Sequence, residues 1–402
     1  MYSSLYVLLP IVIFSNCISK MNVLHTITSL AKADGGPPLS TTLTVQGLRD
    51  LTINAEILAY NTASADGTNI LEGDFIHYLP PPREWQFAYS KAFSNYLENK
   101  KYDLYHCQGI WQYPAYITAK KAQKFNVPYI ITPRGMLYPQ EFERSGIIKR
   151  MALALFQKQD LNAASCVHVT CKEEMEHLRE LGITAPVAVI PNPVETEPYL
   201  EQKVNTPDKI RFGYLGRIHP RKNIERIIYA WDELGEETVN SELIVMGDGD
   251  DDYHTFLEKE VKKLGLNNIQ FTGFLSGKSK EEKLASLSYL VVPSNFENFG
   301  MIIAEALVRG IPVIASKGTP WQDLETYQCG WWINNDIQTL TVAMREALNT
   351  SERRRHKMAE RGKNLIKQKY TIGEVALKMK AMYNWVLGNS PKPDYIHLDD
   401  QN

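Results

Sequence analysis

The chain has 402 residues, of which 44% are hydrophobic and 22% charged, as is typical of a soluble globular protein with two domains. Its 44 basic and 46 acidic side chains give a formal net charge of −2, which argues against nucleic acid as a partner. Any anionic ligand must therefore be met by local positive charge.

The first twenty residues differ in character from the rest. The apolar run 6–14 is about half the length needed to span a bilayer. No Lys or Arg precedes it, which makes it a poor secretory signal. Residues 1–20 are therefore predicted to be an N-terminal apolar extension. Three explanations remain open: an upstream extension or mis-assigned start, a weak membrane anchor, or a cleaved signal.

Residues 21–200 alternate short apolar runs with longer amphipathic ones. The expected strands are 21–27, 53–60, 102–107, 128–133, 165–171 and 187–191, and the clearest helices are 87–99 and 116–125. Strands that alternate with helices predict a parallel sheet with crossover helices. The Pro-rich, polar run 190–209 then indicates a linker.

The same rhythm restarts within residues 201–371. The expected strands are 210–216, 242–249, 268–274, 289–294 and 311–316, with helices between them. The fold class is therefore α/β, with two Rossmann-like, doubly wound parallel-sheet domains that face each other across a cleft. Helices continue to residue 389, and 390–402 are expected to be a disordered tail.

Five cysteines are scattered along the chain without a C-x-x-C pair. This pattern indicates reduced thiols in a cytosolic protein and argues against a metal site. The cysteines are Cys17, Cys107, Cys166, Cys171 and Cys329.

Two cations follow the first strand of the second domain. Arg217 stands at the end of that strand, and Lys222 stands at the start of the next helix. A guanidinium, an ammonium and a helix N-terminus together suit a diphosphate. The alternative is a surface turn whose bases are solvated.

Glycines follow the next two strands. Gly247 and Gly249 permit close approach of a ligand to the backbone, although the third glycine of a dinucleotide fingerprint is missing. The acids of "GDGDDDY" favour an acidic helix start over a metal site. Gly273 and Phe274 make a tight turn on which a nucleobase can rest, or an ordinary strand exit.

The stretch "SNFENFGMIIAEALVRGIPVIAS" carries Glu297 in a loop and Glu305 in the following helix. Carboxylates accept hydrogen bonds from the paired hydroxyls of ribose and sugars. The amides of Asn298, Phe299 and Gly300 at the helix start can bind a phosphate. The alternative is a solvated Glu297 and a structural Glu305.

The first domain offers further candidates at its strand ends. Gly35 and Gly36 open either a second phosphate loop or a plain turn. His106 and Trp111 lie in "HCQGIWQYP", at the end of the strand that begins with "YDLY", and Arg134 follows the strand 128–133, so all three are expected at the cleft edge. Residues 145–159 predict either a helix on a membrane surface, with its bases on the polar side, or a helix packed between domains.

From about residue 21 to residue 387 the chain resembles the family 4 glycosyltransferases of the GT-B fold. The resemblance is carried by "GRIHPRKNI", "FTGF" and "PSNFENFGMIIAEALVRGIPVIAS" with its E-x7-E spacing. "TPWQDLETYQCGWWI", "GG" near the start and "IPNP" before the linker also look like this family.

The resemblance implies roles for these residues. Arg217 and Lys222 would hold the donor diphosphate, Glu305 the ribose, and Glu297 with residues 298–300 the donor sugar and phosphates. Residues 21–200 would bind the acceptor, 201–371 the donor, and the helix 372–389 would cross back to the first domain. Catalytic roles are expected for Arg217, Lys222 and Glu297, and donor contacts for Gly35, Gly36, Gly216, Gly247, Gly273, Phe274, Asn298, Phe299, Gly300 and Glu305.

Two positions depart from the family pattern. Arg134 stands where many members carry His, and Arg cannot act as a base. It could instead bind an anionic acceptor or the leaving phosphate, which places it with His106 and Trp111 on the acceptor side. Pro193 stands where Gly is common.

The resemblance implies retaining, metal-independent transfer of a sugar from a UDP- or GDP-sugar to a glycan or lipid-linked acceptor. The nucleotide-sugar would be a co-substrate, and no cofactor is expected. The pathway implied is cell-surface polysaccharide or lipopolysaccharide synthesis. The expected place is the cytoplasm, with peripheral contact to the inner face of the plasma membrane. The alternatives are a non-catalytic nucleotide-sugar-binding protein on the same scaffold, and a nucleotide-sugar epimerase, for which no acid/base carboxylates can be assigned.

Overall fold

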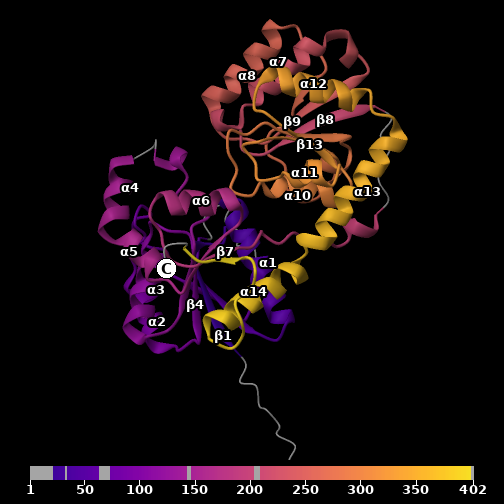
Figure 1. Cartoon of the computed structure of the whole chain (residues 1–402). Coiled ribbons are helices and arrows are strands. Elements are labelled where there is room, and N and C mark those ends of the chain that lie inside the picture. Colours follow the sequence, from indigo (N-terminus) through magenta and orange to yellow (C-terminus); the bar gives the residue numbers. More distant parts are fainter. Residues whose placement is uncertain (1–20, 32–33, 63–72, 143–145, 203–208, 400–402) are drawn as a thin grey trace, which may run out of the picture.

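The computed structural model describes residues 21–31, 34–62, 73–142, 146–202 and 209–399, which form two α/β domains (Figure 1). The fold class predicted from the sequence is confirmed, since each domain is built on a parallel sheet. The expected extension 1–20 lies outside the described residues.

The described strands of the first domain form one sheet in the order β14-β7-β6-β5-β4-β1-β2-β3. Its pairs are parallel except for β14 with β7. The strands are β1 (Asn22–Ser29), β2 (Asn54–Tyr60), β3 (Ile76–Leu79), β4 (Leu104–Gln108), β5 (Tyr129–Thr132), β6 (Cys166–Val169), β7 (Val187–Val189) and β14 (Ile396–His397).

The described strands of the second domain form an all-parallel sheet in the order β10-β9-β8-β11-β12-β13. They are β8 (Ile210–Leu215), β9 (Ser241–Met246), β10 (Ile269–Phe271), β11 (Tyr289–Val292), β12 (Val313–Ser316) and β13 (Gly330–Ile333). In β11, Leu290 and Val292 pack into one core layer and Tyr289 and Val291 into the other. Burial on both faces explains why such strands read as continuous apolar runs.

Helices cover both faces of the first sheet. On one face, α2 (Lys91–Asn99), α3 (Tyr113–Phe125), α5 (Lys158–Asn162) and α6 (Lys172–Glu180) contribute to the core. On the other face lie α1 (Gly36–Asp50) and the C-terminal α14 (Ile372–Val386). A Cβ on Gly47 would lie 2.7 Å from the Ile372 side chain, so α1 and α14 approach closely only because Gly47 has no side chain.

The second sheet is also covered on both faces. The helices α7 (Ile224–Leu234), α8 (Asp251–Lys263) and α12 (Ile337–Leu348) pack on one face. The helices α9 (Gly277–Ala285), α10 (Met301–Val308), α11 (Asp323–Thr326) and α13 (Glu352–Lys369) pack on the other.

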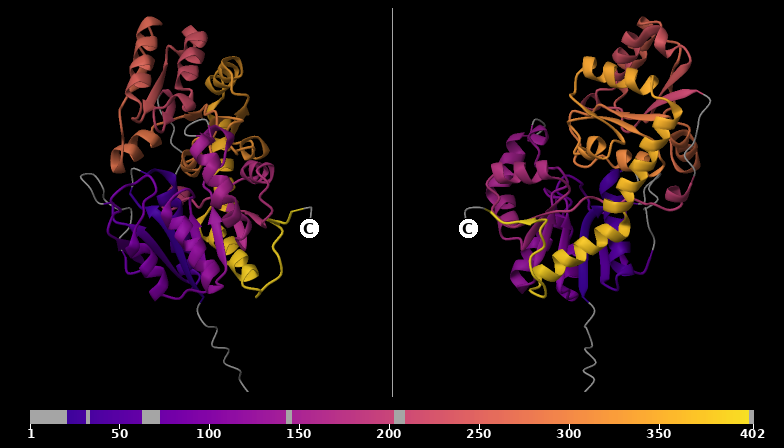
Figure 2. Two further views of the ribbon diagram at one scale, coloured as in Figure 1. Left: turned by 90° about the vertical axis from the view of Figure 1, so that its left-hand side faces the viewer. Right: turned by 45° about the vertical axis from the view of Figure 1, so that its right-hand side comes forward.

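The chain crosses between the domains at two adjacent places. The amide of Val194, in the linker, donates to the carbonyl of Tyr370 at 2.8 Å, and Val194 forms a parallel bridge with Thr371. Thr371 lies between α13, which packs on the second domain, and α14, which packs on the first. Figure 2 shows these two helices running along one side of both domains.

Three local expectations were wrong. The helix expected from residue 87 begins only at Lys91, since Ala88 has φ of 60° and the carbonyl of Phe87 accepts a hydrogen bond from Tyr113. The C-terminal segment is ordered as far as residue 399, because Ile396 is buried and pairs with β7. The strands β3 and β13 were not recognised, since each has only four residues.

Candidate functional site

The carboxyl ends of the two sheets meet, so the segments that follow the strands contact each other across the domains. After β5, a Cβ on Gly135 would lie 2.9 Å from the side chain of Asn298, which follows β11. Thr170, after β6, donates to the Asn298 carbonyl at 2.9 Å. A Cβ on Gly36 would lie 3.4 Å from Met301, so the first residues of α1 and α10 adjoin.

Three predicted glycines line up at the strand ends of the second domain. The amide of Gly216 donates to the Met246 carbonyl at 3.0 Å, and the amide of Gly247 donates to the Gly273 carbonyl at 2.9 Å. A Cβ on Gly247 would lie 1.8 Å from the Gly216 carbonyl oxygen, so no larger residue fits. Beyond Gly273, the Phe274 side chain is 74% exposed.

The predicted cations differ in their surroundings. Lys222 ends the short 3-10 helix Pro220–Lys222, and its ammonium donates to Oε1 of Glu297. The Ser294 hydroxyl donates to the same oxygen at 2.8 Å, which fixes the carboxylate. The Arg217 side chain is exposed and forms none of the ion pairs found among the described residues, while its carbonyl accepts a hydrogen bond from Tyr214 at 2.8 Å.

The start of α10 presents backbone amides. Gly300 caps the helix with φ of 76°, and Phe299 is buried against Trp321 and Tyr370. Within the described part of the chain, no protein acceptor takes a hydrogen bond from the amides of Asn298, Phe299 or Gly300. Free amides at a helix N-terminus form an anion-binding group.

Glu305 lies in α10 and pairs with a residue that the sequence did not single out. Lys280 in α9 donates to Oε2 of Glu305 at 2.5 Å, and both side chains are mostly buried. A signal existed in the lysines of "SGKSKEEK", which follow the strand end at Phe274. The two acids of "SNFENFGMIIAEALVRGIPVIAS" are therefore held by two different cations. Lys222 pairs with Glu297, and Lys280 pairs with Glu305.

His106 does not lie at the edge of the domain interface. It is fully buried, and its two ring nitrogens contact the Tyr383 hydroxyl of α14 and the Thr132 hydroxyl, each at 2.7 Å. Burial, together with the neighbouring His25, holds the pKa of His106 well below its usual value. Its assignment to the acceptor side was wrong, because its side chain points from the sheet face into the core and not beyond the strand end.

Trp111 is also turned away from the expected place. Its ring packs edge-on against Phe142 with centroids 6.2 Å apart, and it belongs to the packing around the core. Its neighbours Ile110 and Gln112 line the cavity described below.

Arg134 is half-buried, and all five of its N–H donors are occupied. They donate to Gln108 twice, at 2.6 and 3.1 Å, and to Ser40, Thr41 and Asn192 at 2.8 to 3.0 Å. Burial lowers the pKa of Arg134 to about 10, although the Glu174 carboxylate acts in the opposite direction. The expectation that Arg134 binds an anion directly was wrong, since it ties α1 to the ends of β4 and β7 and has no donor left.

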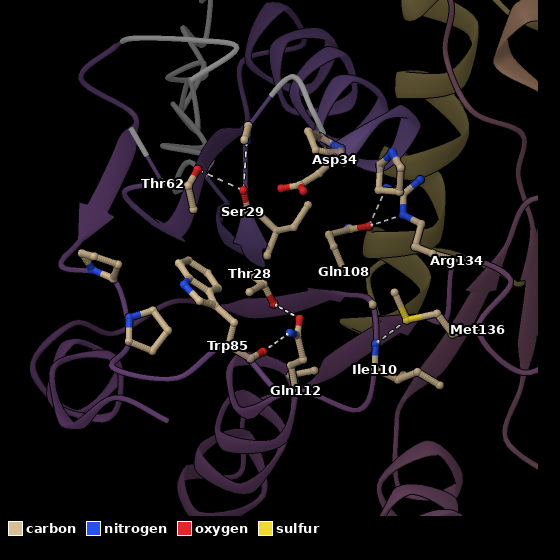
Figure 3. A pocket seen from close by; sticks show the side chains of 18 of the residues that line it. Thr28, Ser29, Asp34, Thr62, Trp85, Gln108, Ile110, Gln112, Arg134 and Met136 are labelled. Carbon is tan, nitrogen blue, oxygen red and sulfur yellow. Dashed lines mark hydrogen bonds between the residues drawn. The ribbon is translucent and has the colours of Figure 1, made fainter. Parts of the chain in front are cut away.

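A cavity of about 820 Å³ opens at the carboxyl ends of β1 to β5 (Figure 3). Its lining mixes the polar side chains of Thr28, Ser29 and Asp34 with the apolar ones of Trp85 and Met136. Gln112 links Thr28 to Trp85, since it accepts a hydrogen bond from the Thr28 hydroxyl at 2.7 Å and donates to the Trp85 carbonyl at 3.0 Å. The sequence did not identify this cavity, because its residues come from separate strand ends.

The lining carries few charges. Among the lining residues, the ionisable ones are Asp34, whose carboxylate points into the cavity, and Arg134, whose donors are used (Figure 3). The cavity therefore suits a neutral, partly apolar ligand with several hydroxyl groups.

The acids beside Gly247 serve the backbone. Asp250 caps α8 by accepting from the Tyr253 amide at 3.0 Å, and Asp248 accepts from the Gly249 amide at 2.8 Å. Among the described residues, no three His, Cys, Asp or Glu side chains are grouped to hold a metal ion. Within the same residues, no helix is long and apolar enough to cross a membrane.

Two family models match consecutive parts of the chain. Residues 35–193 match a glycosyl transferase 4-like domain, and residues 196–365 match glycosyl transferases group 1. The chain belongs to the family 4 glycosyltransferases. The boundary between the two matches coincides with the linker around Val194.

Relatives of known sequence agree with this assignment. A protein of Mycobacterium tuberculosis named GDP-mannose-dependent alpha-(1-6)-phosphatidylinositol dimannoside mannosyltransferase is 30% identical over 157 residues, which are 39% of this chain and 40% of the relative. The match therefore spans less than half of the relative's length. An uncharacterised glycosyltransferase of Methanocaldococcus jannaschii is 26% identical over 87% of this chain and 94% of its own.

Similar folds are found among solved structures. Sucrose-phosphate synthase from Thermosynechococcus elongatus superposes with a TM-score of 0.76 at 20% identity, covering 92% of this chain and all of its own. The HepE protein of Anabaena, solved with UDP and glucose, superposes with a TM-score of 0.70 at 19% identity over 90% of this chain and 99% of its own. At these identities the likeness supports the fold.

Proposed function

We propose that this protein transfers a sugar from a UDP- or GDP-sugar to a hydroxyl group of an acceptor held in the first-domain cavity. The observation that carries the proposal is the start of α10. There, free amides and the Lys222–Glu297 pair adjoin the start of α1. Arg134, which is hydrogen-bonded to α1, also lines the cavity. A donor bound at α10 and an acceptor bound in the cavity would thus be brought together.

The donor would be held through its diphosphate and its ribose. Arg217, Lys222 and the amides of residues 298–300 supply positive charge for the phosphates. Glu305 would accept the ribose hydroxyls, with Lys280 holding the carboxylate in place. The donor is named as GDP-mannose for the mycobacterial relative, and UDP is bound in the Anabaena structure.

We propose transfer with retention at the anomeric carbon. The bond from that carbon to the diphosphate breaks, and its electrons pass to the leaving phosphate oxygen. The acceptor oxygen forms the new bond on the same face and gives its proton to that phosphate. Lys222 and Arg217 would stabilise the growing charge, which is worth several kcal/mol in such sites, without requiring a metal ion.

The acceptor would be a glycan or a lipid-linked sugar of a cell-surface polysaccharide. This rests on the amphipathic lining of the cavity, since a pyranose also has a polar edge and an apolar face. The uncharged ring would fit beside Trp85, with Asp34 and Ser29 accepting or sharing hydroxyl hydrogens.

Peripheral membrane contact, on the inner face of the plasma membrane, belongs to the same proposal. In and just after α4 (Gly146–Ala152), the side chains of Ile147, Ile148, Met151 and Leu155 are 58% to 77% exposed. The alternative of a helix packed between the domains is therefore wrong for these residues. Exposed apolar side chains beside Arg150 suit an anionic bilayer. The test is flotation with anionic vesicles, which Ile148→Ser should weaken. Flotation that this substitution leaves unchanged would contradict the proposed membrane contact.

A screen of thermal unfolding with UDP- and GDP-sugars tests the donor assignment, because a ligand that binds the native state raises the melting temperature. We expect at least one member to raise it. A non-catalytic binding protein would show the same shift without turnover. The support for that alternative is Arg134, which stands where many family members carry His and cannot act as a base, but its five donors are used within the first domain.

A further inference from the structure

Three aromatic side chains lie exposed within five residues beside the cavity. Trp85, Phe87 and Tyr89 are 45%, 36% and 58% exposed. Large aromatic side chains are usually buried, and an exposed group of them marks a binding surface. We call these three residues the aromatic platform.

The backbone of the platform is held in place at several points although it has no regular structure. Between the exposed rings, Ala88 is fully buried, and its carbonyl accepts from the Tyr60 hydroxyl at 2.7 Å. The carbonyl of Phe87 accepts from the Tyr113 amide at 2.7 Å. Glu84 accepts from the Phe87 amide at 3.2 Å.

One position in this segment is strained. Ala88 has φ of 60°, which costs a non-glycine residue about 1 kcal/mol or more. A chain that only had to connect β3 to α2 would not need this conformation. It turns the alanine inward and leaves the aromatic residues on either side at the surface.

The rings themselves are supported by other aromatic side chains. Trp85 meets Tyr60 edge-on, with centroids 6.1 Å apart and planes at 90°. Phe87 and Tyr89 both contact the ring of Tyr113, with centroid-to-centroid distances of 5.7 and 4.9 Å. The platform is therefore ordered before any ligand binds, which reduces the entropy lost on binding.

The platform is continuous with the acceptor cavity. Trp85 lines that cavity, and its carbonyl accepts a hydrogen bond from Gln112, another lining residue (Figure 3). Phe87 and Tyr89 follow Trp85 in the chain, and both rings contact Tyr113, the residue after the lining residue Gln112. A ligand that fills the cavity and extends past Trp85 would meet their faces next.

The chemistry of the platform favours a carbohydrate as the occupant. The C–H groups on one face of a pyranose pack well on aromatic rings, and its hydroxyl groups remain free for water. The strongly exposed aliphatic side chains that suit a bilayer lie instead on and after α4. A platform of aromatic rings beside a polar cavity is thus suited to the next sugars of a chain.

We propose that the aromatic platform is a binding site for the sugar units of the acceptor next to the one that reacts, so that the preferred acceptor is an oligosaccharide. This inference rests on the proposed function, since it takes the cavity as the acceptor site. It predicts that affinity rises with the length of the acceptor.

The test is titration calorimetry with α-linked manno- and gluco-oligosaccharides of increasing length. We compare the wild type with Trp85→Ala, Tyr89→Ala and Tyr89→Phe. Phe125→Ala is the matched control, because Phe125 is also an exposed aromatic residue but contacts neither the platform nor the cavity. Tyr89 is the safer site, since its exposed ring contributes little to folding.

For at least one series, the longer members are expected to bind the wild type about tenfold more tightly than the monosaccharide. Tyr89→Ala should remove this gain, whereas Tyr89→Phe and Phe125→Ala should keep it. Affinity that does not depend on length, a gain that survives Tyr89→Ala, or no measurable binding of any member would overturn the inference.

Two further measurements separate the possible failures. Thermal shifts with UDP- and GDP-sugars report the donor site, so their absence counts against the proposed function and not against the platform. Flotation with anionic vesicles reports a bilayer. If Tyr89→Ala weakens flotation and leaves oligosaccharide affinity unchanged, the platform binds membrane and the inference is wrong.

Discussion

The ammonium of Lys222 donates to the Glu297 carboxylate, although the two residues lie 75 positions apart on different strand ends of the second sheet. Each group therefore neutralises the other while no ligand is bound. The Ser294 hydroxyl donates to the same carboxylate oxygen and helps to hold it in place. A phosphate that binds Lys222 would lie next to the Glu297 carboxylate. Glu297 would then be close to the sugar that this phosphate carries.

Replacing Lys222 with alanine should lower turnover on the order of a hundredfold or more, because the charge on the leaving phosphate loses its nearest ammonium. Steady-state rates with the donor found in the thermal screen provide the measurement. Lys278→Ala is the control, since Lys278 is exposed and its ion-pair partner among the described residues is Glu282 on the same helix. Near-normal turnover of the Lys222 variant would remove the phosphate assignment.

Replacing Glu305 with glutamine should weaken nucleotide binding about tenfold, because the ribose hydroxyls lose a charged acceptor. Calorimetric titration with UDP and GDP measures the change. Glu282→Gln, on the exposed side of α9, should leave affinity as in the wild type. If the Glu305 variant binds both nucleotides normally, the carboxylate serves only to hold Lys280.

Gly247→Ala should destabilise the protein by about 2–3 kcal/mol, because the new Cβ would collide with the Gly216 carbonyl and the backbone has φ of 143°. Urea unfolding gives the free energy. Gly146→Ala offers a matched comparison, since no atom of the described residues lies within 4 Å of the added Cβ there. Equal stability of both variants would mean that the strand ends can separate freely.

Acidification should destabilise the first domain. Burial lowers the pKa of His25 and of His168 to about 3, and also lowers that of His106. In the unfolded chain these residues titrate near 6.5, so below that pH the unfolded state binds more protons. Stability should be constant above about pH 7 and fall below it, by up to about 1.4 kcal/mol per pH unit for each histidine.

Urea unfolding at several pH values between about 5 and 8 measures this slope. His356→Gln serves as the control, since it replaces an exposed histidine on α13, away from the three buried ones. His168→Asn should make it shallower. A slope that does not change in the His168 variant would show that other groups control the acid sensitivity.

The second domain was largely predictable from its sequence. Its site residues follow strands directly, as Arg217 follows β8 and Glu297 follows β11, and a parallel sheet gathers such residues at one edge. The family motifs cover the same segments. What the sequence could not give was the pairing of Glu305 with Lys280, because that contact depends on how α9 packs beside α10.

The first domain was less predictable. His106 sits within a strand, where the alternation of faces sends its side chain into the core under α14. Arg134 is held by Ser40 and Thr41, more than ninety positions earlier in the chain. The cavity combines the ends of five strands, and the strain at Ala88 that exposes the aromatic platform has no sequence signature.

The most direct test of the account is release of nucleoside diphosphate from the donor identified in the thermal screen, measured with an oligosaccharide acceptor for the wild type and for Lys222→Ala. The account predicts release by the wild type, with a glycosylated product in equal amount, and release slower by about a hundredfold in the variant. A wild type that binds the donor but forms no product, or a variant that matches it, would contradict the account.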